Sequence, residues 1–204
     1  PLSRNYRGFQ VNTNQPPGGG IMLLEMLNIL ENFDLTKIGH NSSEYIRVVS
    51  EAMKRATLDK EMFVGDPLFV DIPLEKLLSK KYALDVSKNI ELNVRTFINR
   101  VTQIEPKDTT HVSVVDKAGN CVTMTHSLGM PSGVITDGLG FMYNGCMAVF
   151  DPRSGRAGSI APGKSRFSSL APTIVSKNGS PQIVLGAPGG TQIAMGLLQA
   201  IINV

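Results

Sequence analysis

Two hydroxyl side chains lie at opposite ends of a predicted β-hairpin, an arrangement that could supply a nucleophile and its hydrogen-bonding partner. The hairpin is predicted from a β-branched stretch, a turn-rich loop and a second β-like stretch, at 109–115, 116–120 and 121–127. If the strands pair directly across this loop, Thr109 lies opposite Ser127, with Cβ atoms about 5 Å apart. A register slip of one residue would put Leu128 there instead. Because hydroxyl pairs also occur in ordinary sheets, this pattern alone leaves a catalytic and a purely structural interpretation open.

The glycine pair Gly189–Gly190 is a second candidate, because it follows a predicted strand and precedes a predicted helix over 191–202. Backbone N–H groups at the start of a helix lack partners and attract negative charge. Glycine also lets a substrate approach the backbone closely. Such donors could hold the oxyanion that develops during acyl transfer. A tight strand-to-helix turn is the structural alternative.

A third pattern, Gly158–Ser165, matches the phosphate-loop motif GxxxxGK[ST] letter for letter. A true phosphate loop follows a buried strand and opens a helix. Here the preceding stretch 151–156 is rich in Pro, Gly and charge, and the following stretch soon reaches Pro172. The surrounding sequence therefore predicts no nucleotide site at this motif.

The composition excludes several other functions. With 42% apolar and 18% charged residues, the chain has the composition of a globular protein. The net charge is only +3, and Lys and Arg are scattered, so we predict no nucleic-acid partner. No apolar run is long enough to predict a membrane span. The cysteines and histidines fit no zinc motif, so we predict no metal site and at most one disulfide; these residues are Cys121, Cys146, His40, His111 and His126.

The elements that must position these residues differ between the two halves of the chain. Residues 1 to about 90 are predicted to be mostly helical, and residues 109–204 to form strands, hairpins and a final helix. In the first half, Asn41–Glu44 has the pattern of a capping box before an amphipathic helix, and Pro73 and Ser79 open two shorter helices. In the second half, the predicted elements are a strand at 141–150, a hairpin within 170–186 and the helix at 191–202. A polar linker is predicted at 91–108.

Four sets of segments resemble the γ-glutamyltransferase family of N-terminal-nucleophile hydrolases, both in their amino-acid sequence and in their order. The resemblance extends over nearly the whole chain. The segments are Arg7–Phe9 with Pro16–Gly20 and Leu27–Glu31; Thr109–His111 with Asp116 and Gly119–Asn120; Ser168–Ser169 with Pro172–Val175; and Gly186–Gly190. The resemblance implies a mixed α/β (α+β) fold, an αββα four-layer sandwich of the Ntn-hydrolase type that is incomplete in this fragment. Residues 1–108 would be the C-terminal part of the large-subunit region and 109–204 the N-terminal part of the small-subunit region, together forming one structural domain.

The resemblance also implies an autoprocessing enzyme. The Thr109 hydroxyl would cut the peptide bond after Asp108, which makes Thr109 the new N-terminus. A free α-amino group has a pKa of about 7.7–8.0, so it can act as a base beside its own hydroxyl. The mature enzyme would cleave γ-glutamyl amides such as glutathione through an acyl-threonine, with water or an amino acid as acceptor. It would need no cofactor, and the two regions would stay paired after cleavage.

The same resemblance assigns roles to the candidate residues. Ser127 would orient Thr109, and Gly189 and Gly190 would form the oxyanion hole. Ser168 and Ser169 would bind the α-carboxylate of the glutamyl group.

Two departures from the family pattern leave the acyl substrate open. Gly129 stands where the family usually has an asparagine, and Cys146–Val149 stands where it has an amide and acidic residues. With Val149 there, no carboxylate is expected to pair with a substrate ammonium. A related acylase with a non-glutamyl side-chain specificity and a non-catalytic relative therefore remain alternatives. The family's substrate-binding arginine and a C-terminal part of its small subunit are expected to lie outside this fragment.

Overall fold

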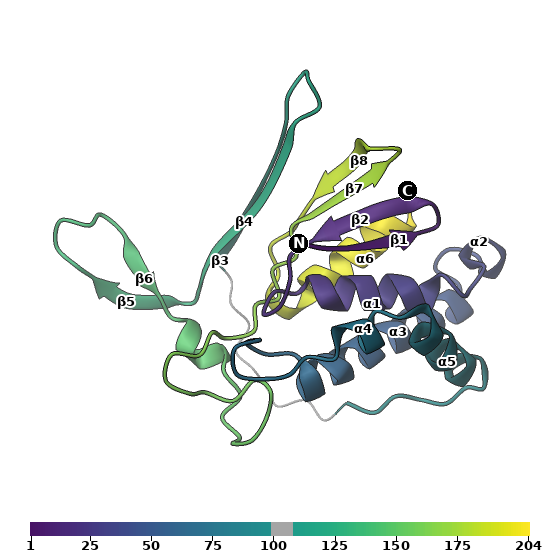
Figure 1. Cartoon of the computed structure of the whole chain (residues 1–204), viewed down its shortest axis with the longest axis horizontal. Helices are drawn as coiled ribbons and strands as arrows, with labels where there is room; N and C mark the ends of the chain where they lie inside the picture. Colours follow the sequence, from purple (N-terminus) through teal and green to yellow (C-terminus); the bar gives the residue numbers. More distant parts are fainter. Residues whose placement is uncertain (99–107) are drawn as a thin grey trace.

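A four-stranded antiparallel sheet forms the upper layer of the molecule in the computed structural model, which describes residues 1–98 and 108–204. The strand order is β1-β2-β7-β8. The strands are β1 (Leu2–Tyr6), β2 (Phe9–Thr13), β7 (Thr173–Lys177) and β8 (Ser180–Leu185). Figure 1 shows this sheet lying over two helices, α1 (Gly20–Leu30) and α6 (Ile193–Ile202). Strands from the two ends of the chain therefore share one sheet.

Residues 1 to about 90 are mostly helical, as predicted, but strands β1 and β2 were not foreseen. They form a hairpin whose tight turn, Arg7–Gly8, has positive φ angles of 49° and 83°. Adjacent residues with positive φ are typical of the turns that match the twist of paired strands. On its other side β2 pairs with β7, from Gln10 opposite Ser176 onward. A strand whose partner lies near the other end of the chain leaves little signal in the local sequence.

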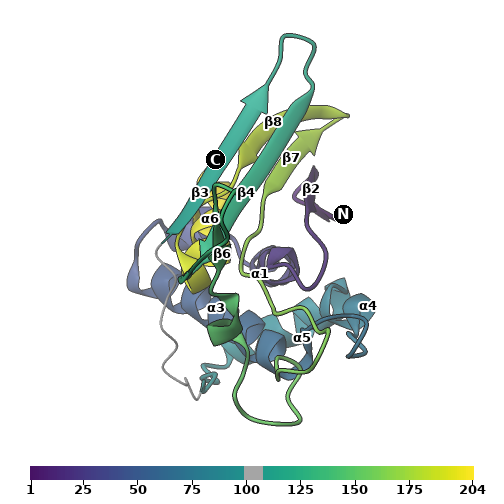
Figure 2. The ribbon, with the colours of Figure 1, turned by 90° about the vertical axis from the view of Figure 1, so that its left-hand side faces the viewer.

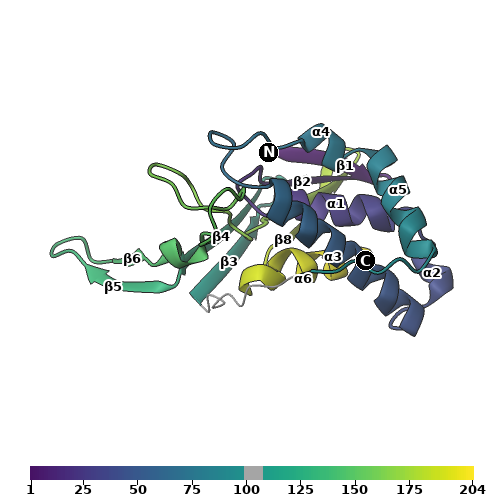
Figure 3. The ribbon, with the colours of Figure 1, turned by 90° about the horizontal axis from the view of Figure 1, so that it is seen from below.

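Helix α1 lies between the sheet and a second layer of helices, and all of its residues are buried. Figures 1 and 3 show this second layer on the side of α1 away from the sheet. Its members are α2 (Leu35–Ile38), α3 (Ser43–Phe63), α4 (Leu74–Leu77) and α5 (Lys80–Glu91). The apolar core joins side chains of α1 and α3 to Val175 of β7 and Leu198 of α6. One core thus contains residues from both sides of Asp108.

Helix α3 begins one residue later than the predicted capping box implies. The N-cap is Ser42, whose Oγ accepts a hydrogen bond from the Tyr45 N–H at 3.0 Å. Asn41 has a φ of 58° and lies outside the helix. Glu44 forms an ion pair with Arg47 at 2.6 Å instead of capping the helix. The predicted starts of α4 after Pro73 and of α5 after Ser79 are confirmed.

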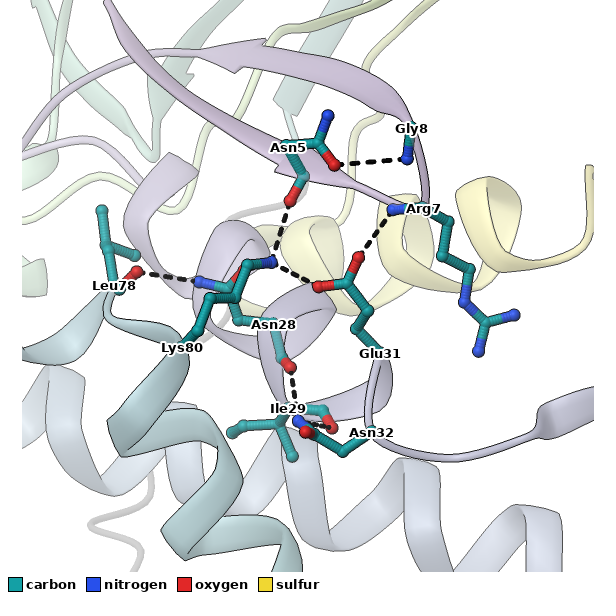
Figure 4. Close-up of polar contacts among 9 residues, drawn as sticks. All are labelled: Asn5, Arg7, Gly8, Asn28, Ile29, Glu31, Asn32, Leu78 and Lys80. Atoms are coloured by element: carbon teal, nitrogen blue, oxygen red, sulfur yellow. Dashed lines mark hydrogen bonds and ion pairs between the residues drawn. The ribbon is translucent and has the colours of Figure 1, made fainter.

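A polar network connects the β1–β2 hairpin to α1 and α5 (Figure 4). The Lys80 ammonium donates to the Asn5 carbonyl at 2.9 Å and to Asn28 Oδ1 at 2.6 Å, and it also pairs with Glu31. Glu31 Oε1 accepts from the backbone N–H of Arg7 at 2.7 Å. One lysine therefore links the hairpin turn to helix α1.

Two further hairpins project from the body of the protein (Figures 1 and 2). The longer joins β3 (Asp108–Val115) to β4 (Cys121–Gly129), and the shorter joins β5 (Pro131–Ile135) to β6 (Met142–Asn144). The strand predicted at 141–150 is wrong beyond β6, because Cys146–Val149 forms a 3₁₀ helix, η1. The backbone N–H of Gly145 still donates to the Met130 carbonyl at 2.5 Å, and the chain leaves the extended path at Cys146.

The other predicted elements of the second half are confirmed. The hairpins at 109–127 and 170–186 are β3–β4 and β7–β8. The final helix is α6, preceded by a short 3₁₀ turn, η2 (Gly190–Gln192). Within the predicted linker at 91–108, stretch 92–98 forms no helix or strand, and 99–107 lies outside the described residues. Cys121 and Cys146 are both free.

No helix within 1–98 or 108–204 combines the length and the apolar character needed to cross a bilayer.

Replacing Asn28 by leucine is expected to destabilise the full-length protein by about 1–3 kcal/mol. Asn28 is 1% exposed, and its Nδ2 donates to the Leu78 carbonyl at 3.1 Å, so the variant leaves buried polar groups without partners. The midpoint of urea unfolding measures the loss. Asn32→Ala is the control, because Asn32 is exposed and its side chain bonds only carbonyls of α1. Equal stability of Asn28→Leu and wild type would contradict the role given to this network.

Helix α1 also carries a buried acid, Glu25, which is 2% exposed. It lies beside Asp59 of α3, which accepts hydrogen bonds from Arg55 Nε at 2.8 Å and from the Tyr82 hydroxyl. Burial, with the hydrogen bond and negative charge of Asp59, raises the pKa of Glu25 well above its ordinary value. The folded protein therefore holds Glu25 in its neutral form.

Glu25→Gln is expected to stabilise the protein at neutral pH. In the unfolded chain a glutamate ionises near pH 4.3, about its ordinary value. Because folded Glu25 keeps its proton, its contribution to stability falls as the pH rises above that value toward the raised pKa. Glutamine removes this titration while still donating to Asp59. Urea midpoints measured from pH 4 to pH 8 should show a gain that grows with pH and vanishes at the acid end.

Glu51→Gln is the matched control with the opposite sign. Burial raises the pKa of Glu51, but hydrogen bonds from Lys54 and Thr96 outweigh it, and the net pKa is lowered. Glu51 therefore contributes stability that is present above its unfolded pKa and lost as the pH falls. Its replacement should lower the midpoint at neutral pH, and a gain in both variants would contradict the assignment for Glu25.

Candidate active site

The predicted register of the β3–β4 hairpin is confirmed. Val115 pairs with Cys121, and Thr109 pairs with Ser127. The Thr109 Oγ1 and Ser127 Oγ atoms are 2.9 Å apart and hydrogen-bonded. In the loop, Asp116 Oδ1 accepts hydrogen bonds from two backbone N–H groups at 2.9 Å, which stabilises the turn that sets this register.

Ser127 is held in place from its other side as well. Its Oγ accepts a hydrogen bond from the Gly129 N–H at 2.8 Å. The strand ladder is irregular between Asp108 and Thr109, which is the peptide bond that the sequence analysis expects to be cut. The structure therefore brings the two candidate hydroxyls together directly beside this bond.

The two faces of the hairpin differ in character. The face that carries Thr109 is mostly polar, whereas the opposite face has an exposed apolar stretch formed by Val112, Val114, Val122 and Met124. On the polar face, His111 bonds Thr125 Oγ1 through Nδ1 and Ser113 Oγ through Nε2, both at 2.9 Å. Burial lowers the pKa of His111, which favours a neutral imidazole.

This polar face contacts the end of β8. The Thr123 hydroxyl donates to the Leu185 carbonyl at 3.2 Å. The His111 ring lies so close to Gly186 that a Cβ there would approach it to 2.2 Å. His111 and Gly186 belong to separate sequence motifs, and this contact between them was not predicted. The available signal was that His111 shares a strand face with Thr109.

Gly189 and Gly190 follow this contact along the chain and begin the turn into α6. Both have positive φ angles, 135° and 53°, and Gly189 O accepts the Gln192 N–H at 2.9 Å. Figures 1, 2 and 3 show the N-terminal end of α6 beside the beginning of β3. The helix thus starts on the nucleophile side of the hairpin, while the role of the glycines as an oxyanion hole stays a prediction.

Ser168 and Ser169 are positioned by the proline- and glycine-rich segment near the N-terminus. The Ser168 N–H donates to the Pro17 carbonyl at 2.7 Å, and the Gly19 N–H donates to the Leu170 carbonyl at 3.0 Å. A Cβ at Gly19 would approach Ser169 O to 2.5 Å. Two motifs that lie far apart in the sequence therefore form one contact. Binding of a substrate carboxylate by the two serines stays a prediction.

The phosphate-loop lookalike has none of the required architecture. No strand leads into Gly158–Ser165 and no helix follows it. Lys164 Nζ donates to the Ala157 carbonyl at 2.9 Å, so it closes its own loop. The Ser165 N–H donates to Asp66 Oδ2 at 2.7 Å, which attaches the loop to the turn after α3. In the part of the chain that the structure describes, no cluster of His, Cys, Asp and Glu is arranged to hold a metal ion.

The 3₁₀ helix η1 lies beside the end of β4. Cys146 Sγ is 3.4 Å from the Leu128 carbonyl oxygen, and a Cβ at Gly129 would lie 2.6 Å from the same sulfur. The stretch Cys146–Val149 carries no charged side chain. This 3₁₀ helix therefore brings no carboxylate to the neighbourhood of Ser127.

Comparisons with known proteins agree over the whole chain. The profile of the gamma-glutamyltranspeptidase family matches residues 1–204. The glutathione hydrolase proenzyme of Escherichia coli is 36% identical over 223 residues, and the Acylase ACY 1 proenzyme of a Pseudomonas species is 37% identical over 207 residues. Each alignment covers 100% of this chain, which spans 38% and 37% of the two relatives.

Comparison with solved structures agrees with the sequence comparisons. A cephalosporin acylase from Bacillus halodurans superposes with a TM-score of 0.81 at 27% identity, covering 100% of this chain and 37% of that one. The predicted mixed α/β fold of the Ntn-hydrolase type is confirmed by this likeness. With the profile match and the paired hydroxyls at the start of β3, the chain belongs to the gamma-glutamyltranspeptidase family.

Proposed function

We propose that the full-length protein is an autoprocessing amidohydrolase and acyltransferase that uses Thr109 as its nucleophile. The hydrogen bond between the Thr109 and Ser127 hydroxyls carries the proposal. A threonine hydroxyl is a weak nucleophile unless a partner orients it and a base takes its proton. The contact with Ser127 supplies the orientation, and the chain break before Thr109 would supply the base.

Maturation would begin with attack of Thr109 Oγ1 on the carbonyl carbon of Asp108. The new C–O bond replaces the C–N bond, and the hydroxyl proton ends on the released amino group. Water then hydrolyses the ester and leaves a carboxylate on Asp108. The irregular ladder at this bond supports the assignment, because the regular strand pairing is interrupted there.

In the mature enzyme the free amino group of Thr109 would accept the proton of its own hydroxyl during attack on a substrate amide. Ser127 keeps the attacking oxygen in position. Backbone N–H groups of Gly189 and Gly190 would hold the oxyanion. The acyl-threonine is then transferred to water or to an amino acid. No cofactor is required for these steps.

The large and small subunit regions, 1–108 and 109–204, would remain associated after the cut. The core supports this, since Val175 and Leu198 pack in the same cluster as α1 and α3. Strand β2 also pairs with β7 across the proposed division. Breaking one peptide bond leaves these contacts unchanged.

The first candidate substrates are γ-glutamyl amides such as glutathione, with Ser168 and Ser169 binding the α-carboxylate. The name of the Escherichia coli relative supports this choice. A second candidate is an acylase with a different acyl group. It is favoured by the uncharged stretch Cys146–Val149 beside β4, which offers no carboxylate for a substrate ammonium, and by the names of the acylase relatives.

Thr109→Ala in the full-length protein is expected to give one uncut species. Intact mass under denaturing conditions should show two pieces for wild type, divided between Asp108 and Thr109. Thr109→Ser is the control, because serine keeps the hydroxyl and should still be cut. Amide hydrolysis should fall about 10³-fold or more in the alanine variant. A wild type that stays uncut on incubation would instead indicate a non-catalytic relative.

Covalent trapping separates the two candidate substrates. The processed wild type is incubated with an electrophilic γ-glutamyl analogue and, separately, with the glutaryl analogue that lacks the α-amino group. For a γ-glutamyl enzyme we expect labelling of Thr109 by the first compound, measured by peptide mass mapping. Labelling by the glutaryl analogue alone, in fully processed protein, would reject γ-glutamyl specificity in favour of the acylase.

A further inference from the structure

Arg166 brings a positive charge to the end of β4 that carries Ser127. Gly129 has a φ of +67° and no side chain, which lets neighbouring side chains approach the strand closely. A Cβ built there would lie 3.8 Å from Nη2 of Arg166. Cys146 fills the rest of this space with its sulfur. The guanidinium of Arg166 therefore lies near Gly129, two residues after Ser127 on β4.

The cation borders the nucleophile through a short series of contacts. The backbone N–H of Gly129 donates to Ser127 Oγ at 2.8 Å. Ser127 Oγ in turn accepts from Thr109 Oγ1 at 2.9 Å. An acyl group bound at Thr109 and extending along the end of β4 would meet Arg166.

The backbone around Arg166 is held on both sides by long-range hydrogen bonds. Just before it, the Ser165 N–H donates to Asp66 Oδ2 at 2.7 Å. Just after it, the Ser168 N–H donates to the Pro17 carbonyl at 2.7 Å. A side chain that starts from such an anchored segment is well suited to a binding role, because its position varies little.

The guanidinium also has unused donor capacity. Arg166 is half-buried, and its side chain donates to the Phe167 carbonyl at 2.9 Å. Among the ion pairs formed by the described side chains, none includes Arg166. A guanidinium carries five N–H donors in a planar fork, which matches the two oxygens of a carboxylate.

We propose that Arg166 is a specificity-determining residue that binds a carboxylate on the acyl group of the substrate. The proposal rests on the proposed function, since it places that acyl group on Thr109. The substrate class is an amide of a dicarboxylic acid, attacked at one carboxyl group and held by the other.

The test compares two anilides of equal chain length, glutaryl p-nitroanilide and pentanoyl p-nitroanilide, in the full-length protein. Only the first carries a carboxylate. In Arg166→Met, kcat/KM for the glutaryl substrate should fall about 10- to 100-fold, mainly through a higher KM. The value for the pentanoyl substrate should change by less than about 3-fold, because it makes no charged contact. Arg166→Lys should recover part of the loss, since it keeps the charge but not the fork.

Arg156→Met is the matched control. Arg156 belongs to the same loop but lines a separate cavity of about 470 Å³ with Met62 and Phe63. Its removal should leave the ratio of the two kcat/KM values unchanged. Equal losses on both substrates in Arg166→Met would indicate a structural role and overturn the proposal, as would an unchanged glutaryl rate.

Processing between Asp108 and Thr109 is measured by intact mass in the same samples. Processed wild type with no preference for the glutaryl over the pentanoyl substrate overturns the carboxylate site alone and leaves the proposed function standing. Wild type that remains unprocessed overturns both. Processed Arg166→Met that has lost the preference supports the site and the nucleophile together.

Discussion

The hydrogen bond between the Thr109 and Ser127 hydroxyls depends on one choice of register in the β3–β4 hairpin. A slip of one residue would turn a side chain to the opposite face and would put Leu128 in place of Ser127. The Asp116 turn opposes such a slip by binding backbone N–H groups within the loop. The difference between the two faces opposes it too, because a slip would bring valines against the end of β8. The position of Thr109, the proposed nucleophile, therefore depends on the hydrogen bonds of the turn at the far end of the hairpin.

Close approaches at glycines assemble the rest of the site. Gly186 makes room for the His111 ring, Gly19 for the backbone of Ser169, and Gly129 for the sulfur of Cys146. At each position a Cβ would approach the neighbouring atoms to 2.6 Å or less, so even alanine would force the two segments apart. These contacts join the β3–β4 hairpin to the residues that precede α6 and to η1. They also join the segment near the N-terminus to Ser169. The geometry of the candidate site therefore depends on glycines at these three positions as well as on its polar side chains.

Helix α1 connects this site to the remainder of the protein. It is buried on all sides, between the sheet and α3, and its polar residues each have a specific role. Asn28 and Glu31 bind Lys80, and Glu25 lies protonated beside Asp59. A buried amide or carboxyl without such a partner would be costly. The match of Leu27–Glu31 to the family pattern thus corresponds to a set of contacts that hold the first hairpin in place.

The sequence by itself determined the elements whose signals are local: the β3–β4 pairing of Thr109 with Ser127, the starts of α3, α4 and α5 to within one residue, and the failure of Gly158–Ser165 as a phosphate loop. It also carried the family resemblance, from which the expected roles of the glycine pair and of the two serines came. Tertiary structure alone decided the β1–β2 strands, the contact of His111 with the end of β8 and the approach of Arg166 to Gly129. In each of these the partners lie far apart in the chain, and no local pattern of polarity or propensity encodes which distant backbone will come within reach.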